Sequence, residues 1–231
     1  MKTNLSFDFM LIDVFNSILF ITILYYTVNK INPINNKQYY DKDYCLILGY
    51  KNEFKKKDII VDMRLTPHLL VSGLSGQGKS KAVEYMMKDK KCVILNCFSE
   101  DFKSLNCKKV NNIKEVENIL LRALKTKKLN KPFYIVIDEL LVLSNNKRIM
   151  DIIKQLLAIA RHKNIYLIGI SQRGLSIELS FKNLFNTRMT FRQIEETSYR
   201  AVLGVNIEKQ LNKREFVVVS DGIYFGKTYN V

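Results

Sequence analysis

The sequence holds little material for a zinc centre. It has four cysteines and two histidines, and no two cysteines form a C-x-x-C pair. The spacing of Cys92, Cys97 and Cys107 fits no common zinc site, because such sites usually take their ligands from closely spaced pairs. The cysteines therefore indicate free thiols in a reducing cytosol.

Acidic residues are also scarce relative to basic ones. The 231 residues include 22 Asp and Glu against 37 Lys and Arg, which gives a net charge of +15 and a pI near 9.6. An excess of this size predicts a polyanionic partner, and nucleic acid is the first candidate. An ordinary solvated surface would also explain any single basic cluster. These clusters lie at 55–57, 88–91, 108–109 and 125–128.

Residues 9–28 carry a single charge, at Asp13. A helix of this length crosses about 30 Å of hydrocarbon, so the sequence predicts a single-pass anchor in the cell membrane. Lys30 and Lys37 follow the stretch and Lys2 precedes it, a bias that places the rest of the chain in the cytoplasm. A cleavable signal peptide is disfavoured because no small-x-small site follows. An amphipathic helix packed on the rest of the chain, or on a partner, is the alternative.

The composition after this stretch predicts a linker and one domain. Residues 29–42 are rich in Asn, Lys and Tyr and show no apolar periodicity, which is typical of a linker. The prediction is therefore an anchoring helix at 1–28, a linker at 29–42 and one folded domain at 43–231. With 47% hydrophobic residues, the chain has ample material for a packed core.

Residues 73–80 read G-L-S-G-Q-G-K-S, a complete G-x-x-x-x-G-K-[ST] phosphate loop between an apolar run and a helical pattern. In such a loop, backbone N–H groups surround the β-phosphate and the Lys reaches the β- and γ-phosphates. The Ser hydroxyl binds Mg²⁺. The motif predicts an ATP site with Lys79 as a catalytic residue and Ser80 as a metal ligand. The predicted nucleotide-binding residues are Gly73, Leu74, Ser75, Gly76, Gln77, Gly78, Lys79, Ser80 and Lys81.

About sixty residues later, five apolar residues at 133–137 end in two carboxylates, Asp138 and Glu139. A buried strand reads as such a run, and its carboxyl end lies in the crevice where phosphates bind. Asp138 is therefore predicted to hold Mg²⁺. Glu139 is predicted to orient and deprotonate the attacking water.

The remaining pattern alternates short apolar runs with helical segments, which predicts an α/β fold with a mostly parallel sheet flanked by helices. Gln172 falls at the tip of the strand expected at 165–170, where it could sense the γ-phosphate or simply face solvent. Further strands are expected at 45–49, 59–63, 92–96, 187–192 and 215–219, and helices at 113–124, 148–161 and 195–203.

Together these motifs resemble the motor domain of the FtsK/SpoIIIE DNA translocases, within the wider HerA-like group of P-loop ATPases. The match runs from about Leu46 to Tyr229. It includes the P-H-L-L-V-S-G sequence at 67–73, the acidic strand at 135–139, the Gln-Arg end of 165–173, the Thr187-Arg188 pair and the S-Y-R-A-V-L-G run at 198–204.

The resemblance implies a RecA-like fold and ATP hydrolysis that drives double-stranded DNA through the pore of a hexameric ring. It also implies a membrane anchor ahead of the motor. An arginine of one subunit would complete the ATP site of its neighbour by stabilising charge on the transferred phosphoryl group. The candidates for this arginine are Arg161 and Arg188.

Two features depart from the family. Asn96-Cys97-Phe98 stands where the family usually has an Asp-Pro-Lys type of strand end, so the role of that contact is open. No winged-helix DNA reader follows the motor in this sequence. Sequence-guided direction is therefore not expected to reside here.

Three functions follow as hypotheses. The first is a membrane-anchored ATP-driven DNA pump for a mobile element, in conjugation, plasmid movement or phage DNA transfer. The second is a phage genome-packaging or morphogenesis ATPase. The third is an ATP-binding membrane scaffold that recruits a relaxase or another DNA-processing partner of a plasmid or phage.

Overall fold

The computed structural model describes residues 40–51, 54, 56–97, 101–172 and 181–230. The predicted anchor at 9–28 lies outside these residues and stays a prediction. In the described part of the chain, no helix is both long enough and apolar enough to cross a bilayer. The described residues from Asp41 onward belong to one structural unit.

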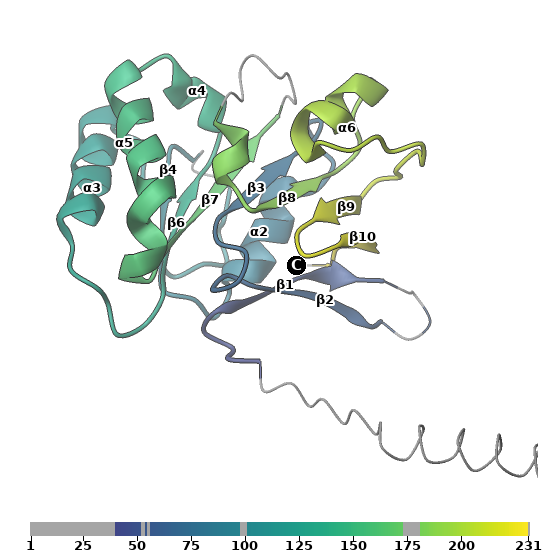
Figure 1. Cartoon of the computed structure of the whole chain (residues 1–231), viewed down its shortest axis with the longest axis horizontal. Helices are drawn as coiled ribbons and strands as arrows, with labels where there is room; N and C mark the ends of the chain where they lie inside the picture. Colours follow the sequence, from purple (N-terminus) through teal and green to yellow (C-terminus); the bar gives the residue numbers. More distant parts are fainter. Residues whose placement is uncertain (1–39, 52–53, 55, 98–100, 173–180, 231) are drawn as a thin grey trace, which may run out of the picture. The chain divides into compact units, whose positions relative to one another are not determined.

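A ten-stranded sheet, with the order β2-β1-β10-β9-β8-β3-β7-β6-β4-β5, organises this unit (Figure 1). Strands β8, β3, β7, β6, β4 and β5 are parallel to one another. Strands β9, β10, β1 and β2 extend the sheet with antiparallel pairs. The strands are β1 (Cys45–Tyr50), β2 (Asp58–Asp62), β3 (Leu69–Ser72), β4 (Cys92–Leu95), β5 (Lys108–Val110), β6 (Phe133–Ile137), β7 (Ile165–Ser171), β8 (Thr187–Thr190), β9 (Glu215–Val219) and β10 (Ile223–Lys227).

Helices cover both faces of the parallel strands, and each face has its own hydrophobic core. Because successive side chains of a strand point to opposite faces, Leu70 packs in the core with α3 and α5, while Leu69 and Val71 pack in the core with α2. The helices are α2 (Lys79–Met87), α3 (Ile113–Lys125), α4 (Leu140–Ser144), α5 (Lys147–Ile159), α6 (Glu196–Leu203) and the short 3₁₀ segments η1 (Ala160–Lys163) and η2 (Lys182–Leu184).

The predicted mostly parallel α/β architecture with flanking helices is confirmed, and it is the fold of P-loop NTPases. The predictions missed strands β5 and β10. Strand β5 has only three residues, two of them exposed lysines, so it lacks the apolar signal of a buried strand. Strand β10 contains Gly226 and exposes Ile223 and Phe225, so it does not show a clean alternation.

The parallel strands give the sheet two chemically distinct edges. We call the edge where these strands end the carboxyl edge; it bears 73–79, Asn96, Asp138, Glu139 and Gln172. The opposite edge, where β4, β6 and β7 begin, is called the amino edge, and it comprises 88–91, 125–131 and 161–163.

Candidate active site

The phosphate loop connects the end of β3 to the start of α2 at the carboxyl edge. Gly78 precedes α2 with a φ of 104°, in the left-handed region that favours glycine. Gly73 has a φ of 138°, and a Cβ there would lie 2.7 Å from the Cβ of Phe191. The first glycine of the motif is therefore required by the close approach of the segment after β8, as well as by its own backbone conformation.

Lys79 lies across the loop that precedes it. Its side chain is buried, and Nζ donates a hydrogen bond to the carbonyl oxygen of Leu74 at 2.9 Å. Burial lowers the pKa of Lys79, and the carboxylates of Glu139 and Asp138 act in the opposite direction. The ammonium group therefore lies within the field of both predicted acidic residues.

The side chain of Lys81 is engaged away from the loop. Its Nζ forms an ion pair with Glu84 at 2.7 Å. Glu84 is buried and also accepts hydrogen bonds from the backbone N–H and the hydroxyl of Ser104, at 2.8 and 2.7 Å. Burial acts to raise the pKa of Glu84, but the hydrogen bonds from Lys81 and Ser104 outweigh it and lower that pKa. Any contact of Lys81 with phosphate would therefore use its backbone N–H.

Asp138 follows β6 and is 3% exposed. Its backbone N–H donates to the carbonyl of Leu95 at 2.9 Å, which fixes the end of β6 against β4. Burial raises the pKa of this carboxyl to about 7, and the nearby charges of Asp101 and Glu139 add to the rise. A buried carboxylate among like charges suits a divalent cation, which would offset that repulsion.

The predicted metal ligands Ser80 and Asp138 therefore offer a donor set that fits Mg²⁺. Ser80 is the second residue of α2 and is half-buried. Its hydroxyl and the Asp138 carboxylate are the hard oxygen ligands that Mg²⁺ prefers. In the loop itself, the side-chain oxygen of Gln77 is buried and has no hydrogen-bond partner among the described residues.

Glu139 and Gln172 come together at the carboxyl edge, although 33 residues separate them in the sequence. Gln172 Nε2 donates to Glu139 Oε1 at 2.5 Å. Glu139 also adopts a φ of 50°, unusual for a residue with a side chain, just before α4 begins. The side chain of the predicted base is therefore held by the residue at the tip of the neighbouring strand.

Asn96 contributes a contact that sequence reasoning did not assign. Its Nδ2 donates to the carbonyl oxygens of Asp138 at 3.0 Å and Glu139 at 3.4 Å. Asn96 itself has a φ of 58°, a conformation that Asn tolerates better than most residues. The departure from the Asp-Pro-Lys pattern thus places an amide under the turn that carries both acidic residues. The available signal was an Asn at the end of a strand adjacent to the acidic one.

A buried polar network joins the phosphate loop to the segment after β8, and sequence reasoning missed it as well. Ser72 donates its hydroxyl to Thr190 at 2.8 Å, and Gln193 Nε2 donates to the same two hydroxyl oxygens, at 3.2 and 2.9 Å. The backbone N–H of Leu74 donates to the carbonyl of Arg192 at 3.0 Å. A shift of the phosphate loop would therefore be transmitted to this segment.

The two candidate interfacial arginines lie apart from these groups. Arg161 is exposed in η1 at the amino edge. Arg188 pairs in register with Leu70 and is half-buried, and burial lowers its pKa. Its Nη1 lies 3.5 Å from the carbonyl oxygen of Val202, and its Nε is buried without a hydrogen-bond partner in the described part of the chain. A role in a neighbouring subunit stays a prediction for both.

The fold and the grouping of Lys79, Asp138, Glu139 and Gln172 define a P-loop ATPase. No family model matches the chain. Among curated proteins it is similar to the DNA translocase FtsK of Borreliella burgdorferi, with 26% identity over an alignment 241 residues long. The alignment covers 82% of this chain and 30% of FtsK. The chain therefore spans less than a third of that relative. The match confirms the predicted resemblance to an FtsK/SpoIIIE-type motor domain.

Several solved structures share the fold. The conjugation coupling protein TcpA of pCW3, in a monomer form with ATPγS, superposes with a TM-score of 0.66 and 18% identity, covering 86% of this chain and 69% of TcpA. The cytoplasmic domain of the type VII secretion ATPase EccC of Thermomonospora curvata superposes with a TM-score of 0.68 and 15% identity, covering 81% of this chain and 29% of EccC. The genome packaging NTPase B204 of Sulfolobus turreted icosahedral virus 2, with ATPγS, superposes with a TM-score of 0.51 and 15% identity, covering 71% of this chain and 98% of B204.

Proposed function

We propose that this protein is a membrane-anchored, ATP-driven DNA translocase of the FtsK/SpoIIIE type. It would move DNA through a ring-shaped homo-oligomer, a hexamer by analogy with the family, on behalf of a mobile element. The observation that carries the proposal is the Gln172–Glu139 contact beside Asp138 and Lys79, since it supports a role for Glu139 as a base held near the phosphate loop. DNA is proposed as the substrate because the similar protein FtsK is a DNA translocase. Membrane attachment and a cytoplasmic motor domain are proposed from the predicted anchor at 9–28.

The chemistry follows from the positions of the side chains. The loop N–H groups and Lys79 would bind the β- and γ-phosphates of ATP, and Ser80 and Asp138 would hold Mg²⁺. The metal ion would neutralise charge on the phosphate oxygens when bound. Glu139 would accept the proton of the attacking water, and Gln172 would keep the Glu139 carboxylate turned toward the γ-phosphate.

Coupling to movement would use the network around Ser72 and Gln193. The segment after β8 is hydrogen-bonded to the phosphate loop, and β8 carries Arg188. A change in the loop on hydrolysis would thus reach the strand whose arginine we propose to act on the neighbouring subunit. Arg161 is the second candidate for that role.

ATP turnover by the full chain, measured alone and with double- or single-stranded DNA, tests the proposal. We expect strong stimulation by DNA and expect the matched variant Glu139→Gln to bind ATP without turning it over. Binding to DNA should fall steeply with salt and show little sequence preference, because phosphate contacts dominate. Turnover that does not respond to DNA would contradict the proposal. It would favour a polypeptide substrate, since EccC of Thermomonospora curvata has been solved in complex with a signal sequence peptide.

A packaging or morphogenesis ATPase is the second candidate, and the likeness to B204 favours it. That likeness covers 98% of the B204 chain and 71% of this chain. The two candidates separate by location: a packaging motor should be recovered with virus particles or their precursors, and an anchored pump with host membranes. A scaffold that recruits a DNA-processing partner would instead keep its function in Glu139→Gln.

A further inference from the structure

We propose that the amino edge is a lipid-facing surface that binds the anionic headgroups of the membrane. The proposal rests on the membrane anchoring stated above and adds a partner for the basic surface of the motor domain. The ligand is defined by its chemistry, as a sheet of phosphate-bearing headgroups with net negative charge.

Three connections meet at the amino edge, because each leads into a neighbouring parallel strand. The backbone N–H of Tyr134 donates to the carbonyl of Lys91 at 2.9 Å, which joins 88–91 to β6. The N–H of Leu129 donates to the carbonyl of Lys163 at 3.0 Å, which joins 125–131 to 161–163. Segments far apart in the sequence therefore form one continuous surface.

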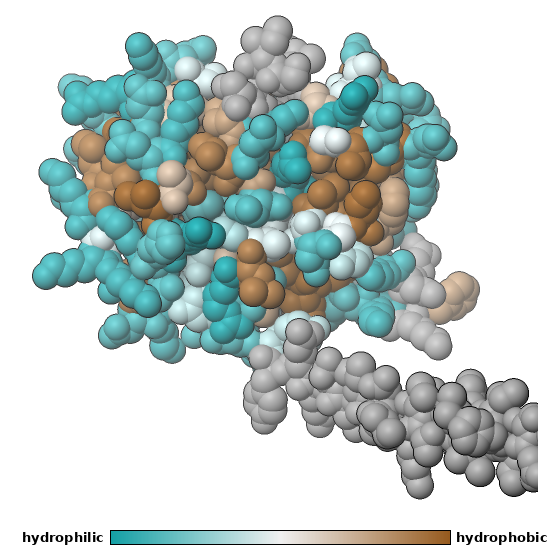
Figure 2. All heavy atoms as spheres, viewed as in Figure 1, coloured by the Kyte–Doolittle hydropathy of each residue, from teal (hydrophilic) through white to brown (hydrophobic). Residues whose placement is uncertain are grey.

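The surface is strongly basic. Its three connections contain nine Lys and Arg and a single carboxylate, that of Asp89, and the carboxylates of Asp41 and Asp43 lie beside them. Within the described part of the chain, the one ion pair that these nine side chains make joins Lys131 to Asp43 at 3.6 Å. In the view of Figure 2, hydrophilic side chains project at the lower left, where Figure 1 places the connection between α3 and β6. The basic residues are Lys88, Lys90, Lys91, Lys125, Lys127, Lys128, Lys131, Arg161 and Lys163.

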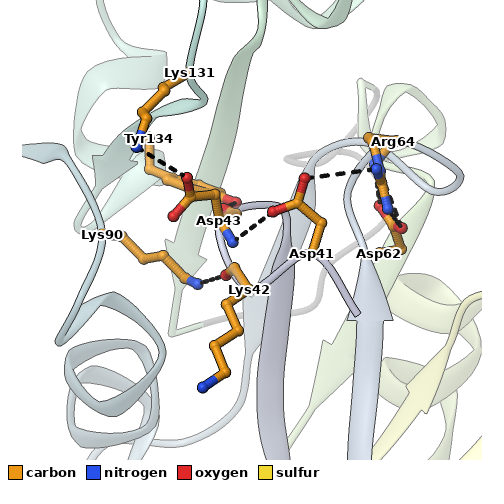
Figure 3. Close-up of polar contacts among 8 residues, drawn as sticks. All are labelled: Asp41, Lys42, Asp43, Asp62, Arg64, Lys90, Lys131 and Tyr134. Carbon is orange, nitrogen blue, oxygen red and sulfur yellow. Dashed lines mark hydrogen bonds and ion pairs between the residues drawn. The ribbon is translucent and has the colours of Figure 1, made fainter. Parts of the chain in front are cut away.

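The described chain begins at this same edge. The Tyr134 hydroxyl donates to the carbonyl of Asp43 at 2.7 Å, and Lys90 Nζ donates to the carbonyl of Lys42 (Figure 3). With the ion pair of Asp43 and Lys131, these contacts tie the start of the motor domain to the amino edge. The part of the motor domain that directly follows the predicted linker therefore lies at the basic surface itself.

The short segment between the predicted anchor and the motor domain favours a membrane as the partner of the basic surface. Thirteen residue steps separate residue 28 from Asp41, so even a fully extended chain spans at most about 45 Å. The tether would hold the basic surface close to the bilayer, at a high effective concentration of headgroups. Eight of the nine cations are lysines, and the three connections contain no Phe, Tyr or Trp. This composition suits diffuse attraction to phosphates better than stacking on exposed bases.

Lysine footprinting on the full chain in vesicles tests the surface directly. The chain is reconstituted in vesicles of phosphatidylcholine or of phosphatidylcholine with phosphatidylglycerol, and acetylation rates are read by mass spectrometry. We expect Lys125, Lys127 and Lys128 to react about fivefold more slowly in the anionic vesicles, and the difference to vanish at high salt. The exposed lysines Lys114 and Lys147, at the opposite ends of α3 and α5, should react equally in both.

A pair of triple variants provides the matched control, since each removes three positive charges. Lys125→Gln/Lys127→Gln/Lys128→Gln should abolish the slower reaction of the remaining Lys88 and Lys91 in anionic vesicles. Lys114→Gln/Lys147→Gln/Lys154→Gln, whose lysines lie away from the amino edge, should preserve it.

Equal reaction rates in the two kinds of vesicle would overturn the proposal. So would slower reaction of the same lysines on addition of duplex DNA to the phosphatidylcholine vesicles alone, because that result assigns the surface to DNA. An alkaline carbonate wash tests the membrane anchoring independently of the lipid-facing surface, because it removes proteins that are held by charge alone. A chain released from both vesicles would overturn the anchoring together with this proposal, whereas a retained chain with unprotected lysines would overturn this proposal alone.

Discussion

The two edges of one sheet differ in chemistry although the same strands supply both. At the carboxyl edge, buried Lys79 and Asp138 lie close together and the pKa of Asp138 rises to about 7. At the amino edge, Lys125, Lys127 and Lys128 are exposed. Strands β3, β4, β6 and β7 between them are only four to seven residues long, about 13 to 23 Å.

The difference shows how a parallel sheet separates tasks. All its strands end at one edge, so residues from distant parts of the sequence converge there on one ligand. The connections that return to the other edge are free to carry a different kind of residue. We therefore expect substitutions at the carboxyl edge to change turnover. Substitutions near the amino edge, apart from Arg161 with its proposed role in a neighbouring subunit, should change stability or attachment.

Lys79→Ala should have the largest effect on the carboxyl edge. Because Lys79 is the buried cation of the loop, its loss should lower ATP turnover at least about 100-fold. Lys154→Ala, on the exposed side of α5, is the control and should leave turnover unchanged. Turnover of Lys79→Ala within a few-fold of the parent would show that the loop does not carry the chemistry.

His68, which directly precedes β3, should make the free energy of unfolding depend on pH. Its Nδ1 accepts the backbone N–H of Leu167 at 3.0 Å, and burial, helped by the charge of Arg161, lowers its pKa to about 4. The unfolded chain takes up this proton near pH 6.5 and the folded chain only near pH 4. Stability is therefore present above pH 6.5 and falls by about 3 kcal/mol as the pH drops to 4.

Urea unfolding at several pH values measures this contribution. His68→Asn keeps an acceptor for Leu167 and tolerates the φ of 65°, so it should fold and lose that part of the pH dependence. His162→Asn, which removes the exposed histidine, should retain it. An unchanged slope in His68→Asn would show that another group titrates.

Asn96→Ala tests whether the amide positions the base. Without its donors, the turn at Asp138 and Glu139 should be less well held, and kcat should fall about tenfold while ATP affinity changes little. In the background of Glu139→Gln the same substitution should have no further effect on turnover. A loss of ATP affinity with unchanged kcat would instead indicate a general structural role.

Tyr134→Phe should have the smallest effect and should act at the amino edge. It removes the hydrogen bond to the carbonyl of Asp43 while keeping the buried ring, and should lower the free energy of unfolding by about 1 kcal/mol. Turnover in solution should not change. A clear loss of turnover would mean that the two edges are coupled, contrary to the comparison above.

Much of the site could be predicted from the sequence because its motifs are local. The phosphate loop is one continuous segment, and Asp138 and Glu139 directly follow a buried strand. The resemblance to the FtsK/SpoIIIE motor rested on the order of such segments. By contrast, Asn96 contacts Asp138, 42 positions along the chain, and Gln193 contacts Ser72, 121 positions away. No local pattern indicates such contacts.

Among the antiparallel strands that the structure describes, β1, β2 and β9 were expected from the sequence and β10 was missed. Strand β10 pairs with both β9 and β1, from opposite ends of the domain, and such pairing leaves little trace in a sequence of five residues.

The sequence by itself determined the chemistry: a loop that fits phosphate, two carboxylates after an apolar strand, and a large excess of lysine. Local backbone rules and composition are enough for that. Only the tertiary structure decided which groups meet. It brought Gln172 to Glu139 and Asn96 beneath both acidic residues, and it joined three lysine-rich connections where the motor domain begins. Strand order in a parallel sheet sets these neighbours, and it is fixed by long-range packing that no local segment encodes.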